Sequence, residues 1–199
     1  MKRRSSISVA APIALLLVLP SLAWAHGGAD AGMPHGAAFI AGFLHPFTGM
    51  DHLLAMLGVG LWSALATRRI WAAPLAFACV LLVGAVFGLA GLTLPAVEPM
   101  LAASLLVLGL LLATRAHLPT SLALGLIGGF ALFHGIAHGT ELPSTQAFAT
   151  LSGMMLATLA LHISGLLAGL YLLARSVWLP RLIGAGVATL GAGLLTGLV

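Results

Sequence analysis

The sequence predicts an all-α, polytopic membrane protein with six transmembrane helices that follow a cleaved signal peptide. Of its 199 residues, 61% are hydrophobic and only 6% are charged, whereas a soluble domain carries about 25% charged residues. Six apolar segments approach the roughly 20 residues that a helix needs to cross the hydrocarbon core. Arginines fall only in every second break between these segments. The solvent of this fold is therefore mostly lipid.

Residues 1–25 are interpreted as a signal peptide. A basic start at residues 2–4 precedes an apolar run over residues 9–19, and residues 23–25 fit the small-x-small pattern of a cleavage site. We expect the mature chain to begin at His26, outside the cytoplasm; the alternative is an uncleaved anchor. Without the three basic residues at the start, the formal charge of +4 falls to +1, which argues against nucleic acid as a partner.

Residues 49–199 are expected to form one transmembrane domain of six helices. Residues 26–48 would form an outer-side arm, in which Ala37 to Leu44 is a short apolar stretch typical of a re-entrant or interfacial segment. The pairs Gly84-xxx-Gly88 and Gly165-xxx-Gly169 favour close helix packing. The expected helices lie near residues 49–66, 71–92, 97–114, 120–138, 146–173 and 181–198.

Charge distribution predicts the orientation. Every arginine of the mature chain falls on one side of the expected bundle: Arg68, Arg69, Arg115, Arg175 and Arg181. The opposite loops hold Glu98 and Glu141 and neither Lys nor Arg. The positive-inside rule makes the arginine side cytoplasmic. The expected location is the bacterial inner membrane, with the mature N-terminus in the periplasm.

The break before the first expected helix carries the first polar motif, His45-Pro46-Phe47-Thr48-Gly49-Met50-Asp51-His52. Thr48 and Asp51 have capping-box spacing, with Thr48 as the N-cap, so Asp51 could simply satisfy helix amides. That interpretation leaves His45 and His52 unexplained. A metal ion held at a helix N-terminus needs a nearby carboxylate, which Asp51 supplies. Met56 shares a helix face with His52 and is a further candidate ligand.

The fourth expected helix ends in a second motif, Phe133-His134-Gly135-Ile136-Ala137-His138-Gly139-Thr140-Glu141. His134 and His138 are four residues apart, so both imidazoles can point at one ion, and the helix C-terminus favours a cation there. Gly139 is expected to cap the helix. The alternative is a dipole partner at His138 and a packed, hydrogen-bonded His134.

Two further histidines are candidate ligands. His162 lies in an uncharged stretch from Ser144 to Ala174 and should sit nearest the midplane; a purely structural role is the alternative. Cleavage before His26 would place a free amine beside an imidazole, and these two nitrogens can chelate a metal. The glycine-rich segment that follows would then be a metal-collecting arm, unless it is an inert solvated tail.

Topology brings the two motifs to the same side of the membrane, so that His45, Asp51 and His52 can meet His134, His138 and Glu141. Imidazole with carboxylate suits borderline divalent ions such as nickel, cobalt, zinc or copper. The single cysteine, Cys79, permits no disulfide and no thiolate cluster. We expect a metal that is transported, with no resident cofactor.

These residues resemble a known family. His45-Pro46-x-x-Gly49-x-Asp51-His52 with the following Leu53-Leu54-Ala55-Met56, the second motif through Glu141, and Leu161-His162 together look like the HupE/UreJ family. The resemblance implies a six-span permease for nickel, or alternatively cobalt, serving hydrogenases or ureases. The first motif, His45 to His52, also resembles, more weakly, the His-Asp-His motif of larger nickel/cobalt transporters. The spacing between His45 and Asp51 differs from the spacing in that motif.

Two other classes of function remain open. An intramembrane metal-dependent hydrolase is suggested by the zincin-like spacing of His134 and His138, although Gly135 stands where the general base would be. A haem-binding electron carrier could use His52 and His134 as axial ligands, but the neighbouring carboxylates argue against it. No phosphate-binding loop is present, so we expect a non-enzymatic permease whose partners are the bilayer, a divalent metal, and either a second copy or a metallochaperone.

Overall fold

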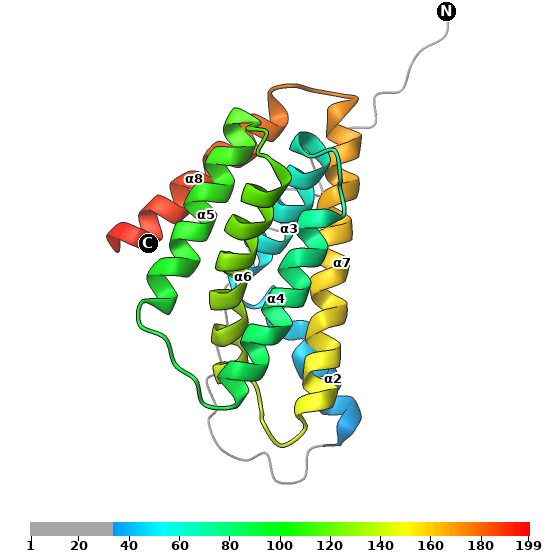
Figure 1. Ribbon diagram of the computed structural model, residues 1–199, viewed down its shortest axis with the longest axis vertical. Coiled ribbons are helices and arrows are strands. Elements are labelled where there is room, and N and C mark those ends of the chain that lie inside the picture. The colour runs from blue at the N-terminus through cyan, green and yellow to red at the C-terminus, as the bar shows by residue number, and fades with distance from the viewer. Residues whose placement is uncertain (1–33) are drawn as a thin grey trace, which may run out of the picture.

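The computed structural model describes residues 34–199, and all regular structure in this part of the chain is helical (Figure 1). The six expected segments each appear as a helix whose ends lie within three residues of the prediction. In chain order the elements are α2 (His35–Leu44), η2 (His45–Phe47, a 3₁₀ turn), α3 (Met50–Ala66), α4 (Ala72–Leu89), α5 (Val97–Thr114), α6 (Thr120–Glu141), α7 (Ala147–Leu173) and α8 (Leu179–Thr196).

Five helices, α4 to α8, are long and apolar enough to cross a membrane. The first expected span differs, because α3 has only 17 residues. It qualifies only together with α2 and η2, as a pair of helices bent by 77° at the break. The described chain is therefore a multi-pass helical protein with five straight candidate spans and a sixth that is bent. The expected signal peptide and His26 lie outside the described residues.

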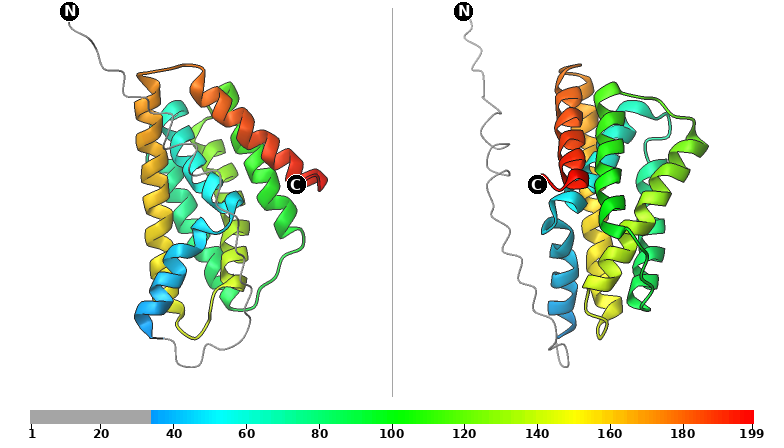
Figure 2. Two further views of the ribbon diagram at one scale, coloured as in Figure 1. Left: turned by 180° about the vertical axis from the view of Figure 1, so that it is seen from behind. Right: turned by 90° about the vertical axis from the view of Figure 1, so that its left-hand side faces the viewer.

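The bent pair lies along the 27-residue helix α7 (Figure 2, left). The expected re-entrant or interfacial segment is helix α2, and its Gly42 contacts the backbone of Thr150 near the start of α7. Further along, Gly60 of α3 contacts the backbone of His162. The break between α2 and α3 therefore faces the middle of α7. At 1.5 Å per residue, it is recessed by about 15 Å along α2.

Glycines bring the helix backbones into direct contact. Gly84 and Gly88 of α4 interlock with Gly135 and Gly139 of α6, and a Cβ at any of the four would meet the backbone of the other helix. Gly165 likewise packs on the backbone of α3. The expectation of close packing at Gly84-xxx-Gly88 is confirmed. The expectation that Gly139 caps α6 is wrong, because α6 continues to Glu141 and ends against Leu142.

The two ends of the bundle differ in charge. The α3–α4, α5–α6 and α7–α8 connections lie at one end and the α4–α5 and α6–α7 connections at the other (Figure 1). The first end contains all five described arginines, as the sequence predicts. Exposed aromatic rings accompany the arginines. Trp71 is the N-cap of α4, and the guanidinium groups of Arg175 and Arg181 lie over the rings of Tyr171 and Trp178. Amphipathic rings of this kind mark a membrane–water interface.

The glycine contact between α4 and α6 can be tested by adding one methyl group. Gly135→Ala is expected to destabilise the protein by about 1–3 kcal/mol, because the methyl overpacks a backbone contact that cannot yield. Thermal unfolding of the detergent-solubilised protein measures this. Gly129→Ala on the same helix, where a Cβ meets open space, is the matched control and should be neutral or slightly stabilising. Equal stability of the two variants would contradict the packing argument.

Candidate metal site

At the break before α3, the side chains of Asp51 and His52 lie against Gly49 at the start of that helix. Pro46 is the second residue of the 3₁₀ turn, and Gly49 is the N-cap of α3. A Cβ at Gly49 would lie 2.8 Å from Asp51 Oδ1 and 3.0 Å from His52 Nδ1, so a larger residue would displace both groups. The predicted capping box is wrong: the Thr48 hydroxyl donates to the carbonyl of His45 at 2.7 Å. Asp51 is thereby left to contact His52.

The outermost group of candidate ligands joins the 3₁₀ turn to the end of α6. His45, His138 and Glu141 each offer one ligand atom, and these atoms lie within 4.8 Å of one another. His45 Nε2 is 3.0 Å from Glu141 Oε2. The Glu141 side chain is about half exposed, whereas His138 is fully buried. This triad therefore runs from the surface of the bundle into its interior.

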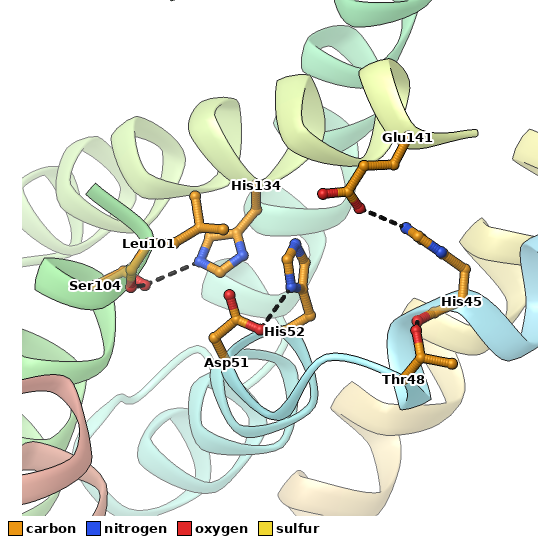
Figure 3. A network of polar contacts seen from close by, with 8 residues as sticks. All are labelled: His45, Thr48, Asp51, His52, Leu101, Ser104, His134 and Glu141. Carbon is orange, nitrogen blue, oxygen red and sulfur yellow. Dashed lines mark hydrogen bonds and ion pairs between the residues drawn. The ribbon is translucent and has the colours of Figure 1, made fainter. Parts of the chain in front are cut away.

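A second group lies deeper and shares a member with the first. The His52 ring is 4.2 Å from the ring of His138 and 5.1 Å from that of His134, measured between centroids. Asp51 Oδ1 lies 2.9 Å from His52 Nδ1. Figure 3 shows His52 directed into the space between Asp51, His134 and Glu141. The two motifs predicted to meet do meet, and His138 connects the outer triad to the deeper group.

The hydrogen bonds orient the rings of this cluster. Ser104 gives its only hydroxyl proton to the carbonyl of Leu101 at 2.6 Å, so at its 2.9 Å contact with His134 it accepts a proton from Nε2. The Nδ1 atom of His134 therefore carries a lone pair. His52 donates from Nδ1 to Asp51, which leaves the lone pair on its Nε2. Carboxylate and hydroxyl partners that fix an imidazole in this way are typical of metal-ligating histidines.

The free nitrogens of these rings have no partner. His52 Nε2, His134 Nδ1 and both nitrogens of His138 are buried and make no hydrogen bond. An unsatisfied buried polar group costs about 1–3 kcal/mol, and native proteins contain few of them. A neutral imidazole carries a proton on one of its two nitrogens, so His138 offers one lone pair and the cluster offers three. Beside two carboxylates, these three nitrogens form a donor set that a divalent transition metal would satisfy.

Three predicted ligands lie apart from this cluster. His162 is buried on α7 and donates from Nδ1 to the carbonyl of Thr158 at 2.7 Å. The ring of Phe77 contacts both His162 and His134. Met56 is fully buried in the apolar core, one turn beyond His52. His26 lies outside the described residues, so its role as a ligand stays a prediction.

Two polar residues near the cluster escaped the sequence analysis. Ser104 is a single hydroxyl in an apolar helix, and nothing in its neighbours along the chain signals that it faces His134. Glu98 was noted only for its charge. It lines a cavity of about 480 Å³ together with Asp51, between the start of α3 and the ends of α5 and α8 that lie away from the arginines. Only the packing of these three helices places Glu98 near Asp51.

The fold and the site define a multi-pass helical membrane protein with a buried cluster of histidines and carboxylates. The chain belongs to the HupE/UreJ family, because the family model for HupE / UreJ protein matches residues 14–194. It is 42% identical to Protein HupE of Rhizobium leguminosarum bv. viciae over 184 residues, which cover 91% of this chain and 94% of that protein. No solved structure matches.

Loss of His138 should weaken metal binding most, because this ring contacts both groups of ligands. His138→Ala is expected to lower the affinity of the purified protein for Ni²⁺ by more than about 10-fold, since even loss of a residue that only supports a ligand costs about 10–100-fold. Isothermal titration calorimetry in detergent measures this. His117→Ala, an exposed histidine at the arginine end, is the control. Unchanged affinity in His138→Ala would remove this ring from the site.

Proposed function

We propose that this protein is an inner-membrane permease that carries a divalent transition metal, nickel or cobalt, into the cell for the maturation of metalloenzymes such as hydrogenase or urease. The observation that carries the proposal is the set of buried imidazole nitrogens without hydrogen-bond partners. A structural role would pair these nitrogens with protein groups. A permease for an ion that binds nitrogen ligands needs imidazole nitrogens that are not already hydrogen-bonded to protein groups.

The chemistry of the cluster supports the choice of ion. Imidazole nitrogens suit nickel, cobalt, zinc and copper, whereas calcium and magnesium prefer oxygen ligands. The cluster contains three buried histidines and half-buried His45, with Asp51 and Glu141 as its carboxylates. Membership of the HupE/UreJ family favours nickel among these ions. The metal is a transported substrate in this proposal.

Charge and aromatic residues support the orientation. The end with all five described arginines would face the cytoplasm by the positive-inside rule, so α2 and the α6–α7 connection would face the periplasm. The mature N-terminus would begin there after removal of the signal peptide, and His26 would collect metal for the site. In this orientation the histidine cluster is reached from outside.

The route would begin at two openings on the outer side. Glu141 is exposed at the mouth of the outer triad, and the cavity lined by Glu98 leads to Asp51. A cation would be attracted to these carboxylates and then be passed between overlapping ligand sets that share His138. Ligands that bind in several partial sets allow release as well as capture, which a permease needs and a storage site does not.

The two other classes of function receive less support. Gly135, which stands where a zincin carries its general base, packs against the backbone of α4 and away from any substrate space. The rings of His52 and His134 are in T-shaped contact at 5.1 Å, which leaves no room for a haem between them. The arrangement favours handling of a bare metal ion.

Nickel uptake by cells that express the protein tests the proposal. His52→Ala and Asp51→Ala should each abolish most ⁶³Ni²⁺ accumulation, because each removes one member of the bonded pair at the break, while the protein still inserts. Competition with cobalt, zinc and copper ranks the metals. Phe87→Ala, which removes an exposed ring from α4, should accumulate nickel normally. Full accumulation in a well-expressed His52→Ala, Asp51→Ala double variant would exclude this site, and absence of uptake by the wild type would exclude the function.

A further inference from the structure

The ring of Phe77 is in contact with two buried histidines that come from different helices. Its centroid lies 5.7 Å from the ring of His134 and 5.1 Å from the ring of His162. Phe77 is 1% exposed, and both histidines are buried to the same degree. Phe77 comes from α4, His134 from α6 and His162 from α7. Three helices thus converge on one aromatic ring in the interior of the bundle.

The polar atoms beyond Phe77 have the same character as those of the outer cluster. His162 donates from Nδ1 to Thr158, so its Nε2 carries a lone pair, and that atom is buried without a partner. The hydroxyl oxygen of Thr158, one turn earlier on the same face of α7, is also buried and unpartnered. A nitrogen and an oxygen that can bind a metal are therefore buried there without partners. They lie nearer the arginine end than His52, because the backbone of His162 contacts Gly60, eight residues after His52 on α3.

A cavity approaches the same region from the arginine end. It has a volume of about 260 Å³ and is lined by residues that include Arg68, Arg69, His117 and Ala73. Ala73 lies on α4 one turn before Phe77, about 6 Å along the helix. Along α4, Phe77 therefore lies between Ala73, which lines this cavity, and Leu81, whose backbone contacts Gly135 next to His134.

We propose that Phe77 is the gate of the permeation path and that His162 with Thr158 forms the stop immediately inside it. The proposal rests on the proposed function. Phe77 offers an ion neither nitrogen nor oxygen, so an ion leaving His134 Nδ1 reaches His162 Nε2 only when the ring turns aside. A small, mostly apolar void adjoins the ring and is lined by Phe77, Ser104 and Ile127.

An apolar ring between the two ligand sets would prevent leakage of water and protons. A chain of free imidazoles that ran through the whole bundle would also conduct water and protons. An apolar ring between two ligand sets interrupts that chain and keeps a water-filled route closed while no ion is passing. Motion of the ring, rather than affinity at the outer cluster, then sets the rate of transfer.

The gate is tested by access to a thiol beyond it. In a Cys79→Ala background, which removes the only native cysteine, His162→Cys places a thiol on the inner side of Phe77. A small, membrane-impermeant methanethiosulfonate ethylammonium reagent is added to intact cells from outside, and labelling rates are measured. Labelling should be slow with Phe77 present and at least about 10-fold faster with Phe77→Ala, because the open gate exposes the thiol.

Two further variants keep the outcome decisive. Phe77→Leu retains most of the apolar volume and removes the flat ring, so it should also speed labelling even where Phe77→Ala fails to fold. Phe87→Ala, which removes a lipid-exposed ring from the same helix, should leave the rate unchanged. Equal labelling rates in folded Phe77→Leu and in the Phe77 parent would overturn the gate.

The labelling experiment does not depend on nickel transport. If the wild type takes up no nickel while labelling still depends on Phe77, the proposed function fails and the barrier at Phe77 stands. If the wild type takes up nickel and labelling ignores Phe77, the permease stands and the gate fails. In the supporting case, Phe77→Leu changes the initial rate of ⁶³Ni²⁺ uptake and leaves the Ni²⁺ affinity of the outer cluster as it is in the wild type.

Discussion

Direct contact between helix backbones at glycines is the constraint on which the site depends. Gly135 and Gly139 lie against α4, and each follows a histidine of the cluster directly along the chain. Successive residues of an α-helix are turned by about 100°, so the packing that seats these glycines also turns His134 and His138 toward α3. The repeated His-Gly pair therefore joins a structural requirement to a chemical one, and neither residue of the pair is free to vary alone.

The break between α2 and α3 places metal ligands inside the bundle, away from both of its ends. Irregular backbone inside a membrane is tolerated only where its polar groups are satisfied or line a cavity. Here the hydroxyl of Thr48 satisfies the carbonyl of His45, and Asp51 borders a cavity. Packing of α2 and α3 along one continuous helix, α7, holds the bend in place. The ligands are thus carried on rigid elements although they sit beside a break.

The cluster that results is preorganised at a cost. Partners such as Asp51 and Ser104 fix the rings, and the free nitrogens stay buried without hydrogen bonds. A binding site that is already ordered spends little on ordering when its ligand arrives. The same absence of partners destabilises the empty protein by about 1–3 kcal/mol for each atom. The close helix contacts elsewhere in the bundle offset this cost.

The sequence by itself determined the helical class, the boundaries of the apolar helices, the end at which arginines gather and most members of the cluster, because lipid leaves few places for polar residues and their spacing along a helix is read directly. It could not reveal that α3 is the inner half of a bent pair, that Thr48 turns away from a capping role, or that α6 continues past Gly139. These depend on which helix packs against which. The roles of Ser104, Glu98 and Phe77 were also hidden, since a hydroxyl, a carboxylate in the first turn of α5 and a core ring acquire their roles only from neighbours that are far away along the chain and that tertiary packing brings together.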